Sequence, residues 1–151
     1  MVSASPRRRV QFDLLATDAD GEPVLVAEVK RHPRAREDAT QQLQAYLAMA
    51  GIRYGLVVDP DLAEFFELTD APSIRSLLKV PTEQILTAYA HGLDPKKLSE
   101  SYLVTLVDTW LRNIMQPLDS DPPPAYERLV EVGLADRLRD GHAAVEWSGS
   151  F

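Results

Sequence analysis

Three ionisable residues lie inside two apolar segments near the start of the chain, and their types and spacing suit metal-dependent chemistry. Asp13 interrupts the segment 10–17, and Glu28 and Lys30 interrupt the segment 23–30 at alternate positions. Charged side chains are seldom buried in strands unless they are paired or bind a metal. Because strand side chains alternate between faces, Glu28 and Lys30 are expected on the same face. Two carboxylates and a lysine at a hairpin therefore predict a metal site with its own general base or electrostatic helper.

The elements that position these residues are predicted from apolar periodicity and turn residues. Asp18-Ala19-Asp20-Gly21 is expected to form a hairpin turn, and Gly51 is expected to close a helix as its C-cap. We expect the second and third strands to run parallel, joined by a right-handed crossover through the first helix, and the fourth strand to lie at the sheet edge. The expected elements are strands over 10–17, 23–30, 54–58 and 63–68, helices over 35–50, 81–91, 95–115 and 126–139, and a short strand or tail over 143–147.

Length and composition indicate one globular domain over residues 1–151, with a core over 10–68 and a helical extension over 73–151. The chain contains no cysteine, which excludes disulfides, zinc–thiolate sites and thiol catalysis. No stretch approaches the roughly 18 apolar residues of a membrane span. The first ten residues lack the apolar run of a secretory signal. We therefore expect a soluble cytoplasmic protein that does not associate with a membrane.

The net charge of −7 is unfavourable for a protein that binds nucleic acid, but the charge is unevenly distributed. Residues 1–36 contain seven Lys or Arg against five Asp or Glu, whereas residues 59–151 contain eight against sixteen. The acidity thus belongs to the second half of the chain. It weakens the case for nucleic-acid binding without removing it.

The order of these residues resembles the PD-(D/E)xK nuclease superfamily. Asp13 and then Glu28-Val29-Lys30 lie on a predicted hairpin that is followed by a helix and another strand. Phe12 replaces the usual proline before the aspartate, a departure that many members tolerate. Gln42 and Tyr46 lie four residues apart on the predicted helix and resemble the QxxxY motif of the RecB-type branch, so they are expected to share a helix face. The resemblance covers roughly residues 10–68 and implies a restriction-endonuclease-like α/β fold, with a mixed central sheet flanked by helices and, here, a helical C-terminal half.

The chemistry of phosphodiester hydrolysis explains these residue types. Hard oxygen ligands suit Mg²⁺ or Mn²⁺, and the carboxylates of Asp13 and Glu28 with the main-chain carbonyl of Val29 are the expected ligands. Lys30 is expected to orient the attacking water or to stabilise charge on the phosphate. The resemblance implies that Gln42 helps to position the water or phosphate and that Tyr46 contacts the backbone or packs beneath it. The side chains expected to bind the phosphate chain are Arg31, His32, Arg34 and Arg36.

One element of the resemblance is missing, and this leaves alternatives open. Many members carry a further acidic residue on a helix before the first strand, but none of the nine residues before Val10 is acidic. Either two carboxylates suffice, or an acid such as Glu37 or Asp38 substitutes, or the activity is weak or lost. Asp13 could also simply cap a turn or form a structural ion pair with Lys30.

The expected function is therefore a Mg²⁺-dependent deoxyribonuclease that hydrolyses phosphodiester bonds in DNA. The alternative is a catalytically inactive or partner-dependent nuclease-fold module that binds protein or nucleic acid. DNA is the expected partner, and a homodimer through the amphipathic segment 95–115 and a larger defence or repair complex are further expectations. DNA against RNA, exonuclease against endonuclease, and any sequence preference stay open at this point.

Overall fold

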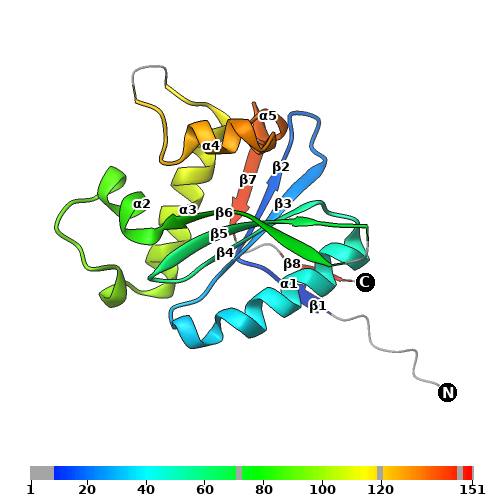
Figure 1. Cartoon of the computed structure of the whole chain (residues 1–151), viewed down its shortest axis with the longest axis horizontal. Helices are drawn as coiled ribbons and strands as arrows, with labels where there is room; N and C mark the ends of the chain where they lie inside the picture. The colour runs from blue at the N-terminus through cyan, green and yellow to red at the C-terminus, as the bar shows by residue number, and fades with distance from the viewer. Residues whose placement is uncertain (1–8, 71–72, 119–120, 146–147, 151) are drawn as a thin grey trace.

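The computed structural model describes residues 9–70, 73–118, 121–145 and 148–150, and in this part of the chain six strands form one mixed sheet (Figure 1). The order across the sheet is β6-β5-β4-β3-β2-β7; β3 and β4 are parallel, and the other neighbours are antiparallel. A separate antiparallel pair joins β1 to β8. The strands are β1 (Arg9–Gln11), β2 (Leu14–Thr17), β3 (Pro23–Val29), β4 (Tyr54–Val58), β5 (Leu62–Leu68), β6 (Ile74–Pro81), β7 (His142–Val145) and β8 (Ser148–Ser150).

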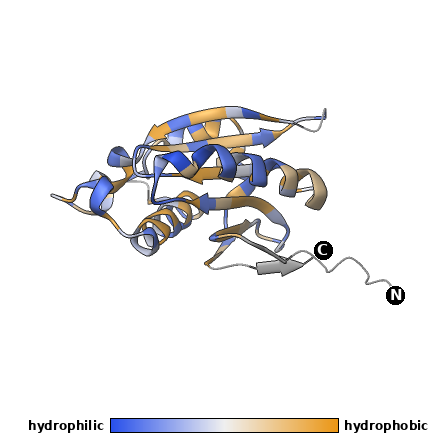
Figure 2. Cartoon of the chain, turned by 90° about the horizontal axis from the view of Figure 1, so that it is seen from below, coloured by the Kyte–Doolittle hydropathy of each residue, from blue (hydrophilic) through white to orange (hydrophobic). Residues whose placement is uncertain are grey.

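Helices cover both faces of the sheet, and the alternation of strand side chains creates two apolar cores. Leu25, Ala27 and Val29 of β3 belong to the core formed with α3, whereas Val26 belongs to the core formed with α1. Figure 2 shows hydrophobic and hydrophilic residues following one another along several strands, and helices that carry residues of both kinds. The helical segments are η1 (Pro33–Ala35), α1 (Arg36–Ala50), α2 (Thr82–Tyr89), η2 (Pro95–Lys97), α3 (Glu100–Met115), α4 (Tyr126–Glu131) and α5 (Leu134–Leu138).

The β3–α1–β4 unit is confirmed, including its parallel strands and the helix end at Gly51, which adopts φ 70°. The helix lies close on the sheet because Gly55 has no side chain. A Cβ at this position would lie 2.5 Å from Leu43 Cδ2. The predicted hairpin turn is also confirmed, with Gly21 at φ 83°. This unit sets the end of the sheet at which Glu28 and Lys30 lie.

The prediction that residues 63–68 form the sheet edge is wrong, because β6 pairs antiparallel along the outer side of β5. Residues 73–151 are likewise more than a helical extension, since they supply β6 and β7 to the two ends of the sheet. Arg75, Ser76 and Lys79 of β6 are exposed, as is common for an edge strand whose charged side chains discourage further pairing.

Several predicted elements are shorter than expected, among them the helix over 81–91, which spans Thr82–Tyr89. The strand over 10–17 is interrupted at residues 12–13, between β1 and β2. The helix over 95–115 begins only at Glu100, because Ser99 caps it by accepting a hydrogen bond from the Tyr102 N–H at 3.1 Å. The helix over 126–139 is divided at Gly133, which adopts φ 83°. In each case a local conformation ends an element that apolar periodicity alone would continue.

The apolar side of α3 packs inside the molecule. Leu103, Val107, Trp110, Leu111 and Ile114 are buried in the core against the sheet. The surface on which a homodimer was expected is therefore covered by the chain itself, and dimerisation is left without that basis. No helix in the described part of the chain is long and apolar enough to cross a membrane.

Candidate active site

Asp13 directly precedes β2, and Glu28 lies near the end of the neighbouring strand β3. The antiparallel pairing of these strands ends at Leu14 and Ala27, and Asp13 and Glu28 are the residues that adjoin this pair. The Asp13 Oδ2 accepts a hydrogen bond from the Val29 N–H at 2.7 Å. This bond fixes the Asp13 carboxylate beside the strand that carries Glu28. The structure thus brings together the two carboxylates that are 15 residues apart in the sequence.

Glu28 and Lys30 form an ion pair on the α1 face of the sheet. The distance from Lys30 Nζ to Glu28 Oε1 is 3.0 Å, and the two side chains are 30% and 10% exposed, respectively. The pKa of Glu28 is raised to about 6, mainly because the carboxyl group is buried. The hydrogen bond and the charge of Lys30 act to lower this pKa, and the charges of Asp13 and Glu100 act to raise it. Glu28 is therefore a nearly buried carboxylate that is mostly ionised at neutral pH but takes up a proton easily.

Lys30 is held in its charged form. Burial acts to lower its pKa, but the hydrogen bond to Glu28 and the charges of Glu28, Glu100 and Asp13 raise the pKa above its ordinary value. A lysine with a raised pKa is a poor general base at neutral pH. Of the roles expected for Lys30, the structure favours electrostatic stabilisation. The ion pair that Lys30 forms with Glu28 also gives it a structural role.

Glu100 is the residue of this site that the sequence reasoning missed. It lies in the first turn of α3, and its charge acts on both Glu28 and Lys30. The expected substitutes for the missing acid, Glu37 and Asp38, lie exposed in the first turn of α1. The chain position of Glu100, 72 residues after Glu28, carries no local signal that would connect the two.

A hollow of about 370 Å³ adjoins the carboxylates. It lies between the first turns of α3, the end of β7 and the residue that precedes β2. Its lining residues are Asp13, Glu100, Ser101, Val104, Thr105 and Val145. The candidate site thus has an open space beside it that is large enough for part of a substrate.

The two residues of the QxxxY motif differ in how far they are exposed. Tyr46 is buried, and its ring packs against Phe12 with a centroid distance of 4.4 Å; burial raises the pKa of its hydroxyl. Gln42 is exposed one turn earlier in α1, on the side of the helix that Tyr46 occupies. Since Phe12 directly precedes Asp13, this side of α1 supports the segment that carries the first carboxylate. A packing role for Tyr46 agrees with this geometry.

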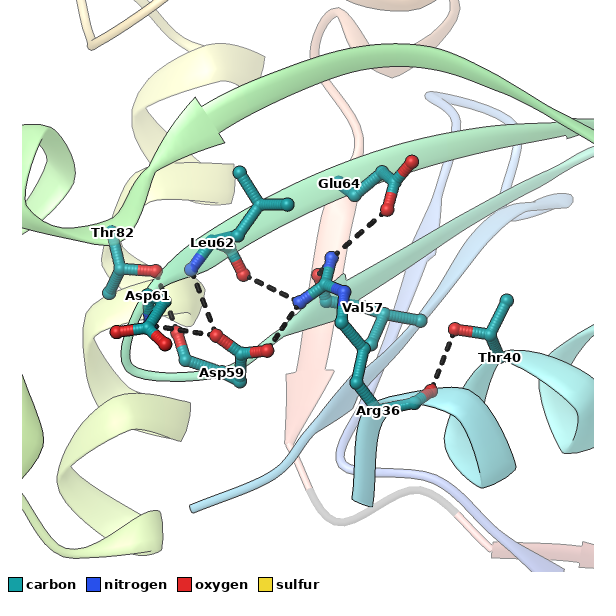
Figure 3. Close-up of polar contacts among 8 residues, drawn as sticks. All are labelled: Arg36, Thr40, Val57, Asp59, Asp61, Leu62, Glu64 and Thr82. Atoms are coloured by element: carbon teal, nitrogen blue, oxygen red, sulfur yellow. Dashed lines mark hydrogen bonds and ion pairs between the residues drawn. The ribbon is translucent and has the colours of Figure 1, made fainter. Parts of the chain in front are cut away.

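The four side chains expected to bind phosphate divide into two groups. Arg31, His32 and Arg34 are exposed in the segment that follows Lys30. Arg36 instead points into the protein, where its guanidinium donates to four acceptors (Figure 3). These are Asp59 Oδ2 at 2.8 Å, the Leu62 carbonyl at 2.9 Å, the Val57 carbonyl at 3.2 Å and Glu64 Oε1 at 3.3 Å. Arg36 is thus engaged in holding the fold together.

The cluster around Arg36 joins the start of α1 to the turn between β4 and β5. Asp59 is 2% exposed, and its Oδ1 accepts from the Asp61 and Leu62 N–H groups at 2.7 and 2.9 Å. The Thr82 hydroxyl donates to the Asp59 carbonyl at 2.7 Å (Figure 3). Glu28, Val57 and Glu64 occupy paired positions across β3, β4 and β5, so the cluster adjoins the candidate site on the same face.

The donor atoms of the site are compatible with a hard divalent cation, although no three His, Asp or Glu side chains converge into a ready metal-binding group within the described residues. Asp13 and Glu28 provide carboxylate oxygens, and the Val29 carbonyl lies between Glu28 and Lys30 in the chain. Mg²⁺ commonly binds one or two carboxylates and completes its shell with water and substrate phosphate. The residues present therefore fit such an ion without a third protein carboxylate.

No protein family, curated protein or solved structure matches this chain.

Proposed function

We propose that this chain is a metal-dependent nuclease that hydrolyses phosphodiester bonds in DNA, built on a restriction-endonuclease-like variant of its mixed α/β sheet. The observation that carries the proposal is the arrangement of Asp13, Glu28 and Lys30. The two carboxylates adjoin the last residue pair of β2 and β3, Lys30 lies 3.0 Å from Glu28, and Asp13 lines an open hollow. Asp13 is not part of the Glu28–Lys30 pair of 3.0 Å, and the hydrogen bond from the Val29 N–H holds its carboxylate next to the strand that carries Glu28.

The carboxylates of Asp13 and Glu28 and the carbonyl of Val29 would hold Mg²⁺ or Mn²⁺. When bound, the cation supplies Lewis-acid stabilisation and lowers the pKa of a coordinated water. Glu28 is mostly ionised at neutral pH because its pKa is about 6, and it is therefore in the form that binds a cation. The hydrogen bond from the Val29 N–H keeps the Asp13 carboxylate in place.

Lys30 contributes a fixed positive charge to the reaction. The Glu28 carboxylate and the neighbouring acids keep its amine protonated, so it stabilises negative charge that develops on the phosphate. The exposed side chains of Arg31, His32 and Arg34 follow directly in the chain and would extend the phosphate contacts along the nucleic acid. Gln42 is exposed and able to reach a bound substrate, whereas Tyr46 packs under Phe12.

A second candidate function is a nuclease-fold module without catalysis. The observation that favours it is that both carboxylates already have partners within the protein. Glu28 forms an ion pair with Lys30, and the Asp13 carboxylate accepts a hydrogen bond from the Val29 N–H. Such a module would bind nucleic acid or protein but would show no Mn²⁺ binding by calorimetry. Mn²⁺ binding that is lost in Glu28→Ala would exclude this candidate.

Incubation of the purified protein with linear, circular and single-stranded DNA, and with RNA, in the presence of Mg²⁺ or Mn²⁺ tests the catalytic proposal. Cleavage is expected to fall at least about 100-fold in Asp13→Asn and in Lys30→Met, the scale of losing an electrostatic group in an active site. The matched controls are Asp20→Asn in the exposed hairpin turn and Lys79→Met on the exposed side of β6, which should cleave like the unmodified protein. Absence of cleavage, or equal cleavage by Asp13→Asn and its control, would refute the proposal.

A further inference from the structure

The hollow beside Asp13 combines the properties of a binding site for a small neutral group. Its volume of about 370 Å³ lies within the range of roughly 300–1,000 Å³ found for small-molecule sites. Two of its lining residues, Asp13 and Glu100, act electrostatically on Glu28 and Lys30. Asp13, one of the groups assigned to the reaction, therefore belongs to the lining, and a molecule in the hollow would lie beside it.

The walls of the hollow offer apolar surface and hydroxyl groups from two elements. Val104 of α3 is 8% exposed, and Val145 at the end of β7 is 44% exposed, so β7 leaves an accessible apolar surface here. The Thr105 hydroxyl donates to the Ser101 carbonyl at 3.1 Å, and its oxygen retains the ability to accept a hydrogen bond. Aliphatic walls with a few hydroxyls are suited to the sugar and base of a nucleotide.

The charge of the lining distinguishes between the parts of a nucleotide. Glu100 places at the hollow an acidic side chain to which no cation is assigned, and it would repel a phosphate there. The ammonium of Lys30 lies on the Glu28 side of the same site and attracts a phosphate. The electrostatics therefore favour a neutral group in the hollow and the phosphate beside Lys30.

Building on the proposed function, we propose that this hollow is the subsite for the sugar and base of the nucleotide next to the cleaved bond. Val104 and Val145 pack against the nucleoside, and the hydroxyls of Ser101 and Thr105 hydrogen-bond its polar edge. Glu100 keeps its phosphate outside the hollow. The C-terminal half of the chain, through α3 and β7, thereby supplies substrate recognition to carboxylates held by β2 and β3.

Binding is tested without reference to cleavage by titrating the ¹⁵N-labelled full chain with deoxyadenosine and, separately, with inorganic phosphate. Deoxyadenosine at millimolar concentration is expected to shift the amide signals of Ser101, Val104, Thr105 and Val145, and phosphate is not. Thr105→Trp fills the hollow from an exposed helix position and should abolish these shifts. Thr87→Trp makes the same change on the exposed side of α2, away from the hollow, and should leave the shifts intact.

Cleavage of DNA with Mn²⁺ provides the second measurement. Thr105→Trp is expected to lower kcat/KM about tenfold, which is the scale of losing one base contact, whereas Thr87→Trp should not change it. If DNA is cleaved but deoxyadenosine causes no shifts and Thr105→Trp cleaves normally, the subsite is refuted and the proposed function stands. If deoxyadenosine binds as expected but DNA is not cleaved, the nucleoside site stands and nuclease activity is refuted. Shifts at the same amides with phosphate alone would overturn the assignment to a neutral nucleoside.

Discussion

Replacing Arg36 by alanine is expected to lower the free energy of unfolding by about 3 kcal/mol, because it leaves a buried carboxylate without its cationic partner. Asp59 is 2% exposed and would retain only the two main-chain N–H donors at its Oδ1. The carbonyls of Val57 and Leu62 would also lose a charged donor.

The magnitude follows from how deeply each partner is buried. Removing one partner of a buried pair costs roughly 3–5 kcal/mol, and an exposed pair contributes about 0–1 kcal/mol. The Arg36 side chain is 18% exposed and Asp59 is 2% exposed, so the lower end of the buried range applies. Since small domains have unfolding free energies of about 5–15 kcal/mol, this one change would remove a large part of the stability.

Urea denaturation at pH 7 measures the effect through the transition midpoint and the m-value. Arg34→Ala is the matched control, because Arg34 is exposed two residues away and its loss should change stability by about 0.5 kcal/mol or less. Arg36→Lys retains the charge but not the planar fork that reaches several acceptors, so it should fall between the unmodified protein and Arg36→Ala.

A double-mutant cycle isolates the pair itself. Asp59→Asn keeps an oxygen for the Asp61 and Leu62 N–H groups but removes the charge, so the loss on adding Arg36→Ala to it should be about 1–2 kcal/mol smaller than in the unmodified protein. A loss below about 1 kcal/mol for Arg36→Ala, or strict additivity with Asp59→Asn, would refute the view that this cluster anchors α1 to the sheet.

Two further changes test the site and the packing beneath it. The pKa of Glu28 is raised from 4.5 to about 6 in the folded protein, so the native state binds this proton more tightly than the unfolded chain, and stability falls as pH rises from about 4.5 to about 6. Glu28→Gln removes this titration. Denaturation measured between pH 4 and 8 should show the unfolding free energy of the variant rising by up to about 2 kcal/mol relative to that of the unmodified protein as pH increases from about 4.5 to about 6. A difference in unfolding free energy that does not change with pH would contradict this expectation. Gly55→Ala places a Cβ 2.5 Å from Leu43 Cδ2 and should destabilise by about 1–3 kcal/mol in thermal or urea denaturation. The double variant with Leu43→Ala should lose less unfolding free energy than the two single variants lose together. A loss equal to that sum or larger would show that the contact with Leu43 does not cause the destabilisation.

The interior of the core over residues 10–68 was predictable because its determinants are local. The apolar run of β3, the helical periodicity of residues 36–50 and the terminating Gly51 each specify a conformation within a few residues. The alternation of Glu28 and Lys30 likewise predicts a shared face, and the 3.0 Å ion pair confirms it. The expected place of Asp13 beside them follows from the hairpin register.

The outer strands were not predictable from their own residues. The β6 segment IRSLLKVP combines exposed charges with a few apolar positions, and its strand conformation depends on pairing with β5. A short strand or tail was expected over 143–147, and β7 lies at His142–Val145, but its pairing with β2, more than 120 positions away, could not be read from its own residues. Two predicted helices were too long. Ser99 caps the start of α3, and the positive φ of Gly133 separates α4 from α5. Apolar periodicity extends over many residues and therefore does not reveal where one residue leaves the helical conformation.

The sequence by itself determined the chemical types at the site, namely two carboxylates and a lysine on adjoining strands, since strand alternation and hairpin pairing are local rules. Only the tertiary structure decided which further groups act on them. It brought Glu100 on α3 to the site, directed Arg36 away from phosphate and into the fold, and formed the hollow between α3 and β7. These three outcomes depend on how helices pack on opposite faces of one sheet, and that packing is set by contacts between residues far apart in the chain.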